Sequence, residues 1–230
     1  MFKVPLSILV IFIVLLCSTP ALSQVKKDTI SLSALVLKAS PINKSIQNSA
    51  ASVAVIGISD IQKTDGIVLT PILNKVAGVF MQQGAMNTNR ITIRGIGART
   101  PYGTNKIKAY FDGIPITSVN GETVVEDIDV TSIERIEIIK GPNSTSFGSG
   151  LGGVINLYSK ATSIKESFGK YTNTFGSFGL LQQRVSGGFN DDKTNLSTSY
   201  SDLEMEGYRD NSAYKRTNFN LFGKQKIAQK

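Results

Sequence analysis

A glycine-rich stretch has the residue types and spacing that could bind a nucleotide. Residues 148–153 read Gly-Ser-Gly-Leu-Gly-Gly and satisfy the G-x-G-x-x-G pattern. That pattern binds a dinucleotide when a strand precedes the glycines and a helix follows them, because amides at the helix N-terminus hold the pyrophosphate. Here a loop, 142–147, precedes the motif and a β-rich segment, 154–157, follows it. The glycines therefore predict tight turns and close packing of the backbone.

Residues for acid–base, nucleophilic or metal chemistry are scarce. The chain has no His and a single Cys, at position 17, which excludes a Ser-His-Asp triad and the common zinc sites. None of the carboxylates of the central region form a pair suited to acid–base catalysis. Its charged residues are expected to hold turns and strand ends: Asp112, Glu134, Arg135 and Glu137. We therefore expect a protein that is not an enzyme and that needs no cofactor and no metal.

The composition favours a folded protein. The 230 residues are 41% hydrophobic and 18% charged, which is too apolar for a disordered chain. Lys and Arg number 25 against 17 Asp and Glu, so the formal net charge is +8. These basic residues are scattered among acidic ones, without a patch or a motif for nucleic acid. The charge balance thus does not favour nucleic-acid binding.

The first residues have the pattern of a secretory signal. Lys3 precedes an apolar run over 6–16, and residues 21–23, Ala-Leu-Ser, place small side chains where a signal peptidase cuts. The run is about half the roughly 20 residues that a membrane-spanning helix needs, and a short membrane anchor is the alternative. Cleavage would make Gln24 the first mature residue and remove the only Cys. The secreted protein would then fold without disulfides.

Two regions with different patterns follow the signal. From 24 to about 48 the chain is rich in Ser, Lys and Asn, with one apolar island at 32–37. Such a segment cannot bury itself and is expected to be a mobile extension. Residues 50–160 then alternate short apolar segments with Gly-rich turns. This second region predicts a small α+β domain.

The elements of this domain can be placed from periodicity and caps. Its helices are expected at 59–62, capped by Ser59, and at 70–77, with Thr70 as N-cap. Ser132 is expected to cap a turn. The predicted strands are 52–56, 90–94, 108–111, 114–116, 136–140 and 154–158.

After about residue 161 the chain alternates with period two and has no helix signal. Leu, Thr and Tyr share one side of 196–201, and Ser occupies the other; 184–189 and 216–221 alternate similarly. Strands of an outer-membrane barrel show this pattern, although a soluble sandwich also alternates. The segment suffices for about four strands, whereas the smallest single-chain barrels need about eight. We therefore expect either a fragment or last strands that lie in a different structure.

Several blocks of residues 50–160 closely resemble the plug domain of TonB-dependent outer-membrane receptors. In the family's order and spacing, they are 70–73 with 78–79, 91–97, 110–115, 133–142 and 147–156. Residues 165–230, with Gly207-Tyr208-Arg209, resemble the first strands of the family's barrel. The implied fold is an α+β plug domain, with a small mixed β-sheet and short helices, followed by the first antiparallel strands of a transmembrane β-barrel. The barrel is incomplete in this chain, because the family's barrel has about 22 strands.

The resemblance implies energised transport. In the family, the plug blocks the barrel and a ferric chelate or similar scarce solute binds at the outer face. TonB, energised by ExbB and ExbD, then pulls on a short apolar segment, the TonB box. Leu35, Val36 and Leu37 fit the centre of this box, because an extended apolar strand can add to a sheet edge of the partner. Residues 28–32 also resemble some boxes, and the island at 32–37 could instead be the first plug strand.

The resemblance also assigns residues within the plug. Arg94 corresponds to an arginine that pairs with Glu residues of the barrel and locks the plug. Lys140 occupies the second lock position, usually Arg, where it would make a point-charge contact. Arg99 and Tyr102 are the expected ligand residues, since Arg can bind an anionic chelate bidentately and Tyr offers an amphipathic face. Ordinary solvated loop residues are the alternative for both.

These observations together predict a receptor of the cell outer membrane, surrounded by its lipid. The plug would gate energised uptake of a ferric chelate, of siderophore type, or of a similar scarce solute. The alternatives are a secreted β-rich binding or adhesion protein and an inactive truncated receptor. The expected domains are a signal peptide at 1–23, a periplasmic extension with the TonB box at 24–49, the plug at 50–160 and the first barrel strands at 161–230.

Overall fold

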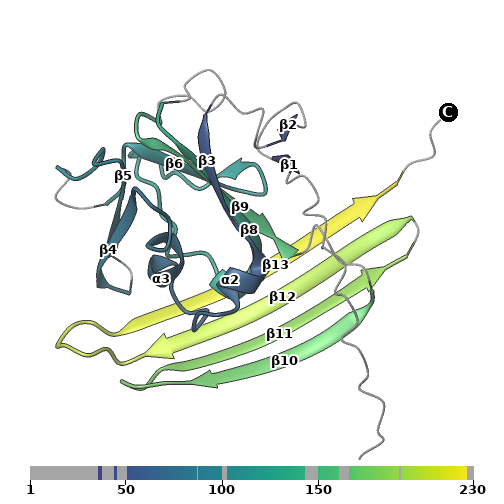
Figure 1. Cartoon of the computed structure of the whole chain (residues 1–230). Coiled ribbons are helices and arrows are strands. Elements are labelled where there is room, and N and C mark those ends of the chain that lie inside the picture. Colours follow the sequence, from purple (N-terminus) through teal and green to yellow (C-terminus); the bar gives the residue numbers. More distant parts are fainter. Residues whose placement is uncertain are drawn as a thin grey trace, which may run out of the picture. The chain divides into compact units, whose positions relative to one another are not determined.

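The computed structural model describes residues 36–37, 44–45, 51–86, 88–99, 103–142, 150–160, 166–191 and 193–226 (Figure 1). All of the described residues belong to one compact unit, Val36–Lys230. The predicted signal segment, Leu35 and Tyr102 lie outside the described residues.

A five-stranded mixed sheet organises residues 51–160. Its strand order is β3-β8-β9-β6-β7, in which β6 and β9 run parallel and the other neighbours run antiparallel. This arrangement confirms the predicted small mixed sheet. The strands are β3 (Ser52–Ile56), β6 (Ile107–Phe111), β7 (Ile114–Pro115), β8 (Ile133–Lys140) and β9 (Gly153–Ser159).

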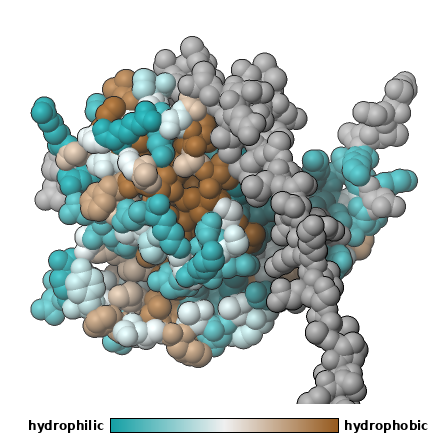
Figure 2. All heavy atoms as spheres, in the orientation of Figure 1, coloured by the Kyte–Doolittle hydropathy of each residue, from teal (hydrophilic) through white to brown (hydrophobic). Residues whose placement is uncertain are grey.

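The hydrophobic core covers both faces of the two central strands. Residues 136–139 of β8 and 153–157 of β9 are all buried, whereas a strand covered on one face would bury every second residue. This explains why both segments read as nearly continuous apolar runs. Figure 2 shows hydrophobic residues gathered around the edge strand β3 on the visible face. The fully buried aliphatic residues include Ile107, Ile136, Ile138, Ile155 and Leu157.

Two one-turn helices and a hairpin complete this part of the chain. The helices are α2 (Ile58–Ile61) and α3 (Thr70–Leu73), and the hairpin joins β4 (Val79–Ala85) to β5 (Thr88–Ile93). The predicted caps are wrong: α2 follows Gly57 without a side-chain cap, and Leu69 holds the N-cap position of α3. Within the described ranges, every helix is too short or too polar to span a membrane.

Asn74 explains why α3 is shorter than the predicted helix over 70–77. Its side chain accepts a hydrogen bond from the amide of Met81 at 2.7 Å and donates one to the carbonyl of Met81 at 3.1 Å. The side chain therefore forms hydrogen bonds with both the amide and the carbonyl of one β4 residue, as a neighbouring strand would. This tertiary contact favours a helix end at Asn74, which local periodicity does not reveal.

A two-residue turn joins β6 to β7, as the Asp-Gly pair predicts. Both Asp112 (φ 47°) and Gly113 (φ 85°) lie in the left-handed region, which is the geometry of a type I′ hairpin turn. The carboxylate of Asp112 also accepts a hydrogen bond from the amide of Ser159 at 2.9 Å. Asp112 thus holds a turn and a strand end, as predicted.

The glycine motif ends in a close approach between strands. The motif is followed by β9, not by a helix, so it lacks the helix N-terminus that a nucleotide requires. A Cβ atom on Gly153 (φ +141°) would meet the carbonyl oxygen of Ile139 in β8. The space between β8 and β9 therefore requires glycine here, which confirms the predicted close packing.

We expect Gly153→Ala to lower the free energy of unfolding by at least about 2 kcal/mol, because the added methyl group forces β8 and β9 apart and strains the backbone. Thermal or chemical unfolding of the detergent-solubilised chain measures the change. Gly57→Ala is the matched control, since Gly57 has φ −90° and a Cβ there meets nothing within 4 Å. Similar losses in the two variants would contradict the steric explanation.

The remaining strands form a four-stranded antiparallel sheet in chain order. We call it the wall sheet. It confirms the predicted run of antiparallel strands. Its strands are β10 (Phe168–Phe175), β11 (Leu181–Asn190), β12 (Thr194–Met205) and β13 (Tyr214–Gln225).

The wall sheet exposes its apolar face. Its register places Tyr171, Val185, Tyr200 and Phe219 in one row across the strands. Large apolar side chains on this face are 45–68% exposed: Tyr171, Val185, Phe189, Leu196, Tyr200, Phe219 and Leu221. The opposite face buries polar residues: Gln182, Ser201 and Arg216. A soluble sandwich would bury the apolar face instead, so this polarity is that of an outer-membrane barrel wall.

Candidate functional site

The polar face of the wall sheet contacts residues 126–132, the segment that leads into β8. This segment contains the 3₁₀ helix η2 (Val130–Ser132), which Asp129 caps. The carboxylate of Asp129 accepts hydrogen bonds from the amide of Thr131 at 3.0 Å and from its hydroxyl at 2.7 Å. The predicted cap, Ser132, instead donates to the carbonyl of Asp129 at 2.6 Å. Asp129 caps η2 because its carboxylate oxygen accepts a hydrogen bond from the free amide of Thr131.

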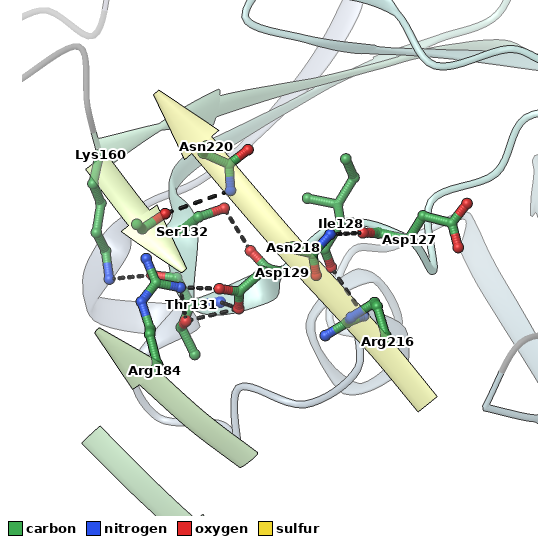
Figure 3. A network of polar contacts seen from close by, with 11 residues as sticks. Asp127, Ile128, Asp129, Thr131, Ser132, Lys160, Arg184, Arg216, Asn218 and Asn220 are labelled. Atoms are coloured by element: carbon green, nitrogen blue, oxygen red, sulfur yellow. Dashed lines mark hydrogen bonds and ion pairs between the residues drawn. The ribbon is translucent and has the colours of Figure 1, made fainter. Parts of the chain in front are cut away.

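Arg184 of β11 binds this capped turn. Its guanidinium forms an ion pair with the carboxylate of Asp129 and donates a hydrogen bond to the hydroxyl of Thr131 (Figure 3). The side chain of Asp129 is 1% exposed and that of Arg184 is 12% exposed. A charge pair so far removed from water depends on both partners, because either one alone would be a buried charge.

Two residues of β13 bind carbonyl groups of the same segment. Arg216 donates to the carbonyl of Glu126 at 2.5 Å and to that of Ile128 at 3.3 Å. Asn218 donates to the carbonyl of Asp127 at 2.7 Å (Figure 3). Side chains from two wall strands therefore hold consecutive residues of one segment, and sequence reasoning missed this because alternation predicts faces and not partners.

Glu126 is a partly buried carboxylate in this segment. Burial raises its pKa above the ordinary value, because loss of water disfavours the ionised form. Hydrogen bonds to the carboxylate, including one from the side-chain amide of Asn89, act in the opposite direction, and the nearby charge of Asp127 adds to the rise. At neutral pH, the ionised carboxylate of Glu126 therefore destabilises the folded state.

Glu126→Gln should raise the free energy of unfolding at neutral pH, since Gln avoids the cost of burying a charge and can still accept from Asn89. Linkage gives the pH dependence: a carboxyl with a raised folded pKa binds protons more tightly when folded, so wild-type stability rises as the pH falls through that pKa. The advantage of the variant should therefore shrink on acidification and become constant below about 4.5, the ordinary value. Thermal unfolding across this range measures it, and an advantage that grows in acid would contradict the explanation.

Arg94 and Lys140, the predicted lock residues, both contact the turn at residues 77–78, which precedes β4. The ammonium of Lys140 donates to the carbonyl of Ala77 at 2.7 Å. The backbone amide of Arg94 (φ 51°) donates to the carbonyl of Gly78 at 2.7 Å. The Arg94 side chain is exposed, and its Nη1 would lie 3.8 Å from a Cβ atom on Gly141, the residue after Lys140. The structure thus places the Arg94 side chain beside Gly141, the residue after Lys140, while the pairing of both cations with Glu residues stays a prediction.

The loop between β12 and β13 contacts the tip of the β4–β5 hairpin. The hydroxyl of Tyr208 and the guanidinium of Arg209 each donate to the carbonyl of Gly84 at 2.9 Å. Arg209 lies 5.0 Å from the ring centre of Tyr208, and Phe178 meets that ring edge-on at 6.1 Å. This aromatic and cationic cluster was not predicted as a site, because the contact joins residues far apart in the sequence.

Arg99, one of the predicted ligand residues, lies exposed after β5. The preceding loop is fastened to the β4–β5 hairpin by Arg90, which donates to the carbonyl of Ala98 at 3.1 Å and to the side chain of Gln82 at 2.5 Å. Hydrogen bonds of Arg90 therefore connect the loop that carries Arg99 to the β4–β5 hairpin, whose tip includes Gly84.

A family model, the TonB-dependent Receptor Plug Domain, matches residues 45–154. The match covers the mixed sheet, the hairpin and the segment that the wall sheet binds. Residues 45–154 therefore belong to the plug domains of TonB-dependent receptors. The wall sheet follows the plug directly in the sequence, and its exposed apolar face agrees with a barrel wall in this family.

Sequence relatives support the assignment over somewhat more than half of the chain. The vitamin B12 transporter BtuB of Vibrio vulnificus is 30% identical over 135 residues, which is 57% of this chain and 21% of that transporter. An iron-regulated outer membrane virulence protein of Vibrio cholerae is 33% identical over 135 residues, 55% of this chain and 20% of that protein. The matches thus span about a fifth of these relatives.

Solved structures have the same fold over a larger share of the chain. The ferric-catecholate import receptor Fiu of E. coli K12 superposes with a TM-score of 0.60 at 22% identity, over 78% of this chain and 25% of that receptor. This likeness includes more residues than the plug alone. It shows that the plug and wall strands share the fold of this larger receptor.

The predicted TonB box is described only in part, at the backbone of Val36 and Leu37. These residues form β1 (Val36–Leu37), which pairs antiparallel with β2 (Lys44–Ser45) in a separate two-stranded sheet. Within the described residues, β1 is therefore not a strand of the five-stranded plug sheet. Its role as a TonB box stays a prediction.

Proposed function

We propose that this chain forms the plug and first wall strands of an outer-membrane receptor that imports a ferric chelate, of siderophore type, with energy from TonB. The observation that carries the proposal is the polarity of the wall sheet, which exposes a row of large apolar residues and binds the plug with its polar face. This arrangement supports lipid on one side and a plugged lumen on the other. The segment 1–23 would direct secretion and 24–49 would extend into the periplasm.

The plug would close the lumen until TonB, energised by ExbB and ExbD, acts on the N-terminal extension. Leu35, Val36 and Leu37 would bind TonB as an added strand, because main-chain hydrogen bonds can join an extended segment to a sheet edge. Arg94 and Lys140 would pair with Glu residues of the barrel. Their position beside one turn, where Lys140 binds a carbonyl and the Arg94 side chain is exposed, supports a shared contact with an acidic partner.

The ligand would bind where the β4–β5 hairpin meets the loop after β5 and the loop between β12 and β13. Arg99 and Tyr102 are the residues proposed from the sequence, and we add Tyr208 and Arg209 to the proposal because both contact the hairpin at the carbonyl of Gly84. Guanidinium groups suit the oxygen atoms of an anionic chelate, and aromatic rings suit its apolar parts. Relatives named for vitamin B12 and ferric catecholate support a chelated metal as the class of solute.

The test is uptake by cells that carry or lack the gene, under iron limitation. Radiolabelled ferric catecholate, ferric citrate and cyanocobalamin serve as probes, with an ionophore that collapses the proton gradient as the control for energy. We expect saturable, gene-dependent uptake of at least one ferric chelate, lost with the ionophore. Gene-dependent binding without uptake of any probe would favour the alternative of a surface binding protein.

A further inference from the structure

Among the described residues, one buried ion pair joins the wall sheet to the plug, between Asp129 and Arg184. Asp129 belongs to the turn that begins β8, and β8 is a central strand of the plug sheet. Arg184 lies at the middle of β11, opposite Ser201 of β12. Any movement of the plug away from these wall strands must therefore break the contact between the two side chains.

Several positive charges lie around the ion pair, so the pair depends on the negative charge of Asp129. The ammonium of Lys160 donates to the carbonyl of Thr131 at 2.7 Å, and burial lowers the pKa of Lys160, with Arg184 and Lys170 adding repulsion. Asp129 thus offsets several nearby positive charges. Without its charge, Arg184 and Lys160 would face each other at a partly buried position, where repulsion is stronger than in bulk water.

A cavity of about 910 Å³ adjoins this pair, between the plug and the wall sheet. Its lining includes polar residues of the plug, Thr131, Ser132 and Lys160, and of the wall, Thr172, Arg184 and Ser199. The lining also includes apolar residues, and the polar groups beside the ion pair are those that could bind water. The ion pair therefore lies where the plug and the wall would separate if this space widened.

We infer that Arg184 is a positioning residue that latches the plug to the barrel wall through Asp129, apart from the predicted lock at Arg94 and Lys140. The latch keeps residues 126–132 against β11 and β13, and its release widens the adjoining cavity into a leak. Arg216 and Asn218 fix the position of the segment through its carbonyl groups, whereas the ion pair supplies the contact that depends on charge. This inference rests on the proposed function.

The test measures leak through the receptor expressed from its full reading frame. Arg184→Gln removes the cation, and Asp129→Asn removes the charge while its side-chain oxygen can still cap η2. Purified receptor in planar lipid bilayers in KCl reports open events, and vancomycin sensitivity reports leak in cells. We expect each variant to raise the frequency of open events at least tenfold, and Arg184→Lys to restore most of the closure because it keeps the charge.

The matched control is Lys215→Gln. Lys215 and Glu204 form an exposed ion pair on the lipid-facing side of the same sheet, at 2.6 Å, so its loss should not change the leak. Thermal unfolding separates a latch from general destabilisation, and Asp129→Asn tests the charge even where Arg184→Gln does not assemble. Normal uptake with an unchanged leak in both latch variants would overturn the latch and leave the proposed function standing. Absence of uptake of every probe by the wild type would instead overturn the proposed function.

Discussion

Deleting Leu35, Val36 and Leu37 from the full-length receptor should reduce energised uptake to background while ligand binding at the cell surface stays unchanged. The reason is that TonB would bind this segment as an added strand, and the deletion removes both the main-chain hydrogen bonds and the apolar side chains that hold the strand. Surface binding depends on the outward loops of the plug and barrel, which the deletion leaves intact. Uptake and binding of a radiolabelled ferric chelate measure the two effects separately.

A point substitution sharpens this experiment. Leu37→Pro removes one backbone donor and restricts the backbone, so it should block strand addition without shortening the extension. Leu37→Val is the matched control, because Val keeps the donor and favours extended structure. Removing residues 28–32 tests the other candidate box. Unchanged uptake after loss of 35–37, together with lost uptake after loss of 28–32, would move the TonB box to the earlier segment.

Local sequence predicted those parts of the plug whose structure is determined by nearby residues. The apolar runs of β8 and β9 are long enough to require burial on both faces, and the Asp112–Gly113 pair has the chemistry that its turn demands. The glycine motif that leads into β9 predicted close packing, and at Gly153, the first residue of β9, only glycine admits the approach of Ile139. In the turn, the signal and its structural cause are adjacent residues, whereas for Gly153 the sequence predicted close packing but not Ile139 of β8 as the partner.

Contacts between distant residues were not predictable in this way. Asn74 ends α3 by binding β4, and Asp129 becomes the cap of η2 while it pairs with Arg184 of the wall. Tyr208 reaches Gly84 across 124 positions of sequence. Ser, Asn and Asp can each cap or end a helix, so the choice among them is made by tertiary partners that one sequence does not reveal.

In the wall sheet, too, the sequence pattern predicted the strands but not what each face contacts. Alternation predicted the strands of 184–189, 196–201 and 216–221, but a soluble sandwich has the same alternation. The structure resolves the choice because the apolar parity, with Phe219 68% exposed, faces away from the plug, and the polar parity, with Arg216 9% exposed, faces toward it. The periodicity thus determines the two faces, and only the fold shows which face is buried.

Arg135→Ala should lower the free energy of unfolding by about 3–5 kcal/mol, the cost of leaving a buried charge without its partner. Glu137 is fully buried in β8, and Arg135, two residues earlier on the same strand, binds its carboxylate at 2.5 Å. The hydroxyl of Tyr158 also approaches the carboxylate, at 3.5 Å, and burial and the negative charge of Glu137 raise the pKa of Tyr158. Denaturant unfolding of the detergent-solubilised chain measures the loss.

Two further variants test whether the loss comes from the unpaired charge. Replacing both partners, Arg135→Met with Glu137→Leu, removes the buried charge as well as its counter-ion, so it should cost much less than Arg135→Ala alone. Lys63→Ala breaks the exposed pair with Asp60 and should change stability little, because water screens that pair. If the double variant were as unstable as Arg135→Ala, lost packing of the long side chains would be the cause, and the electrostatic explanation would be wrong.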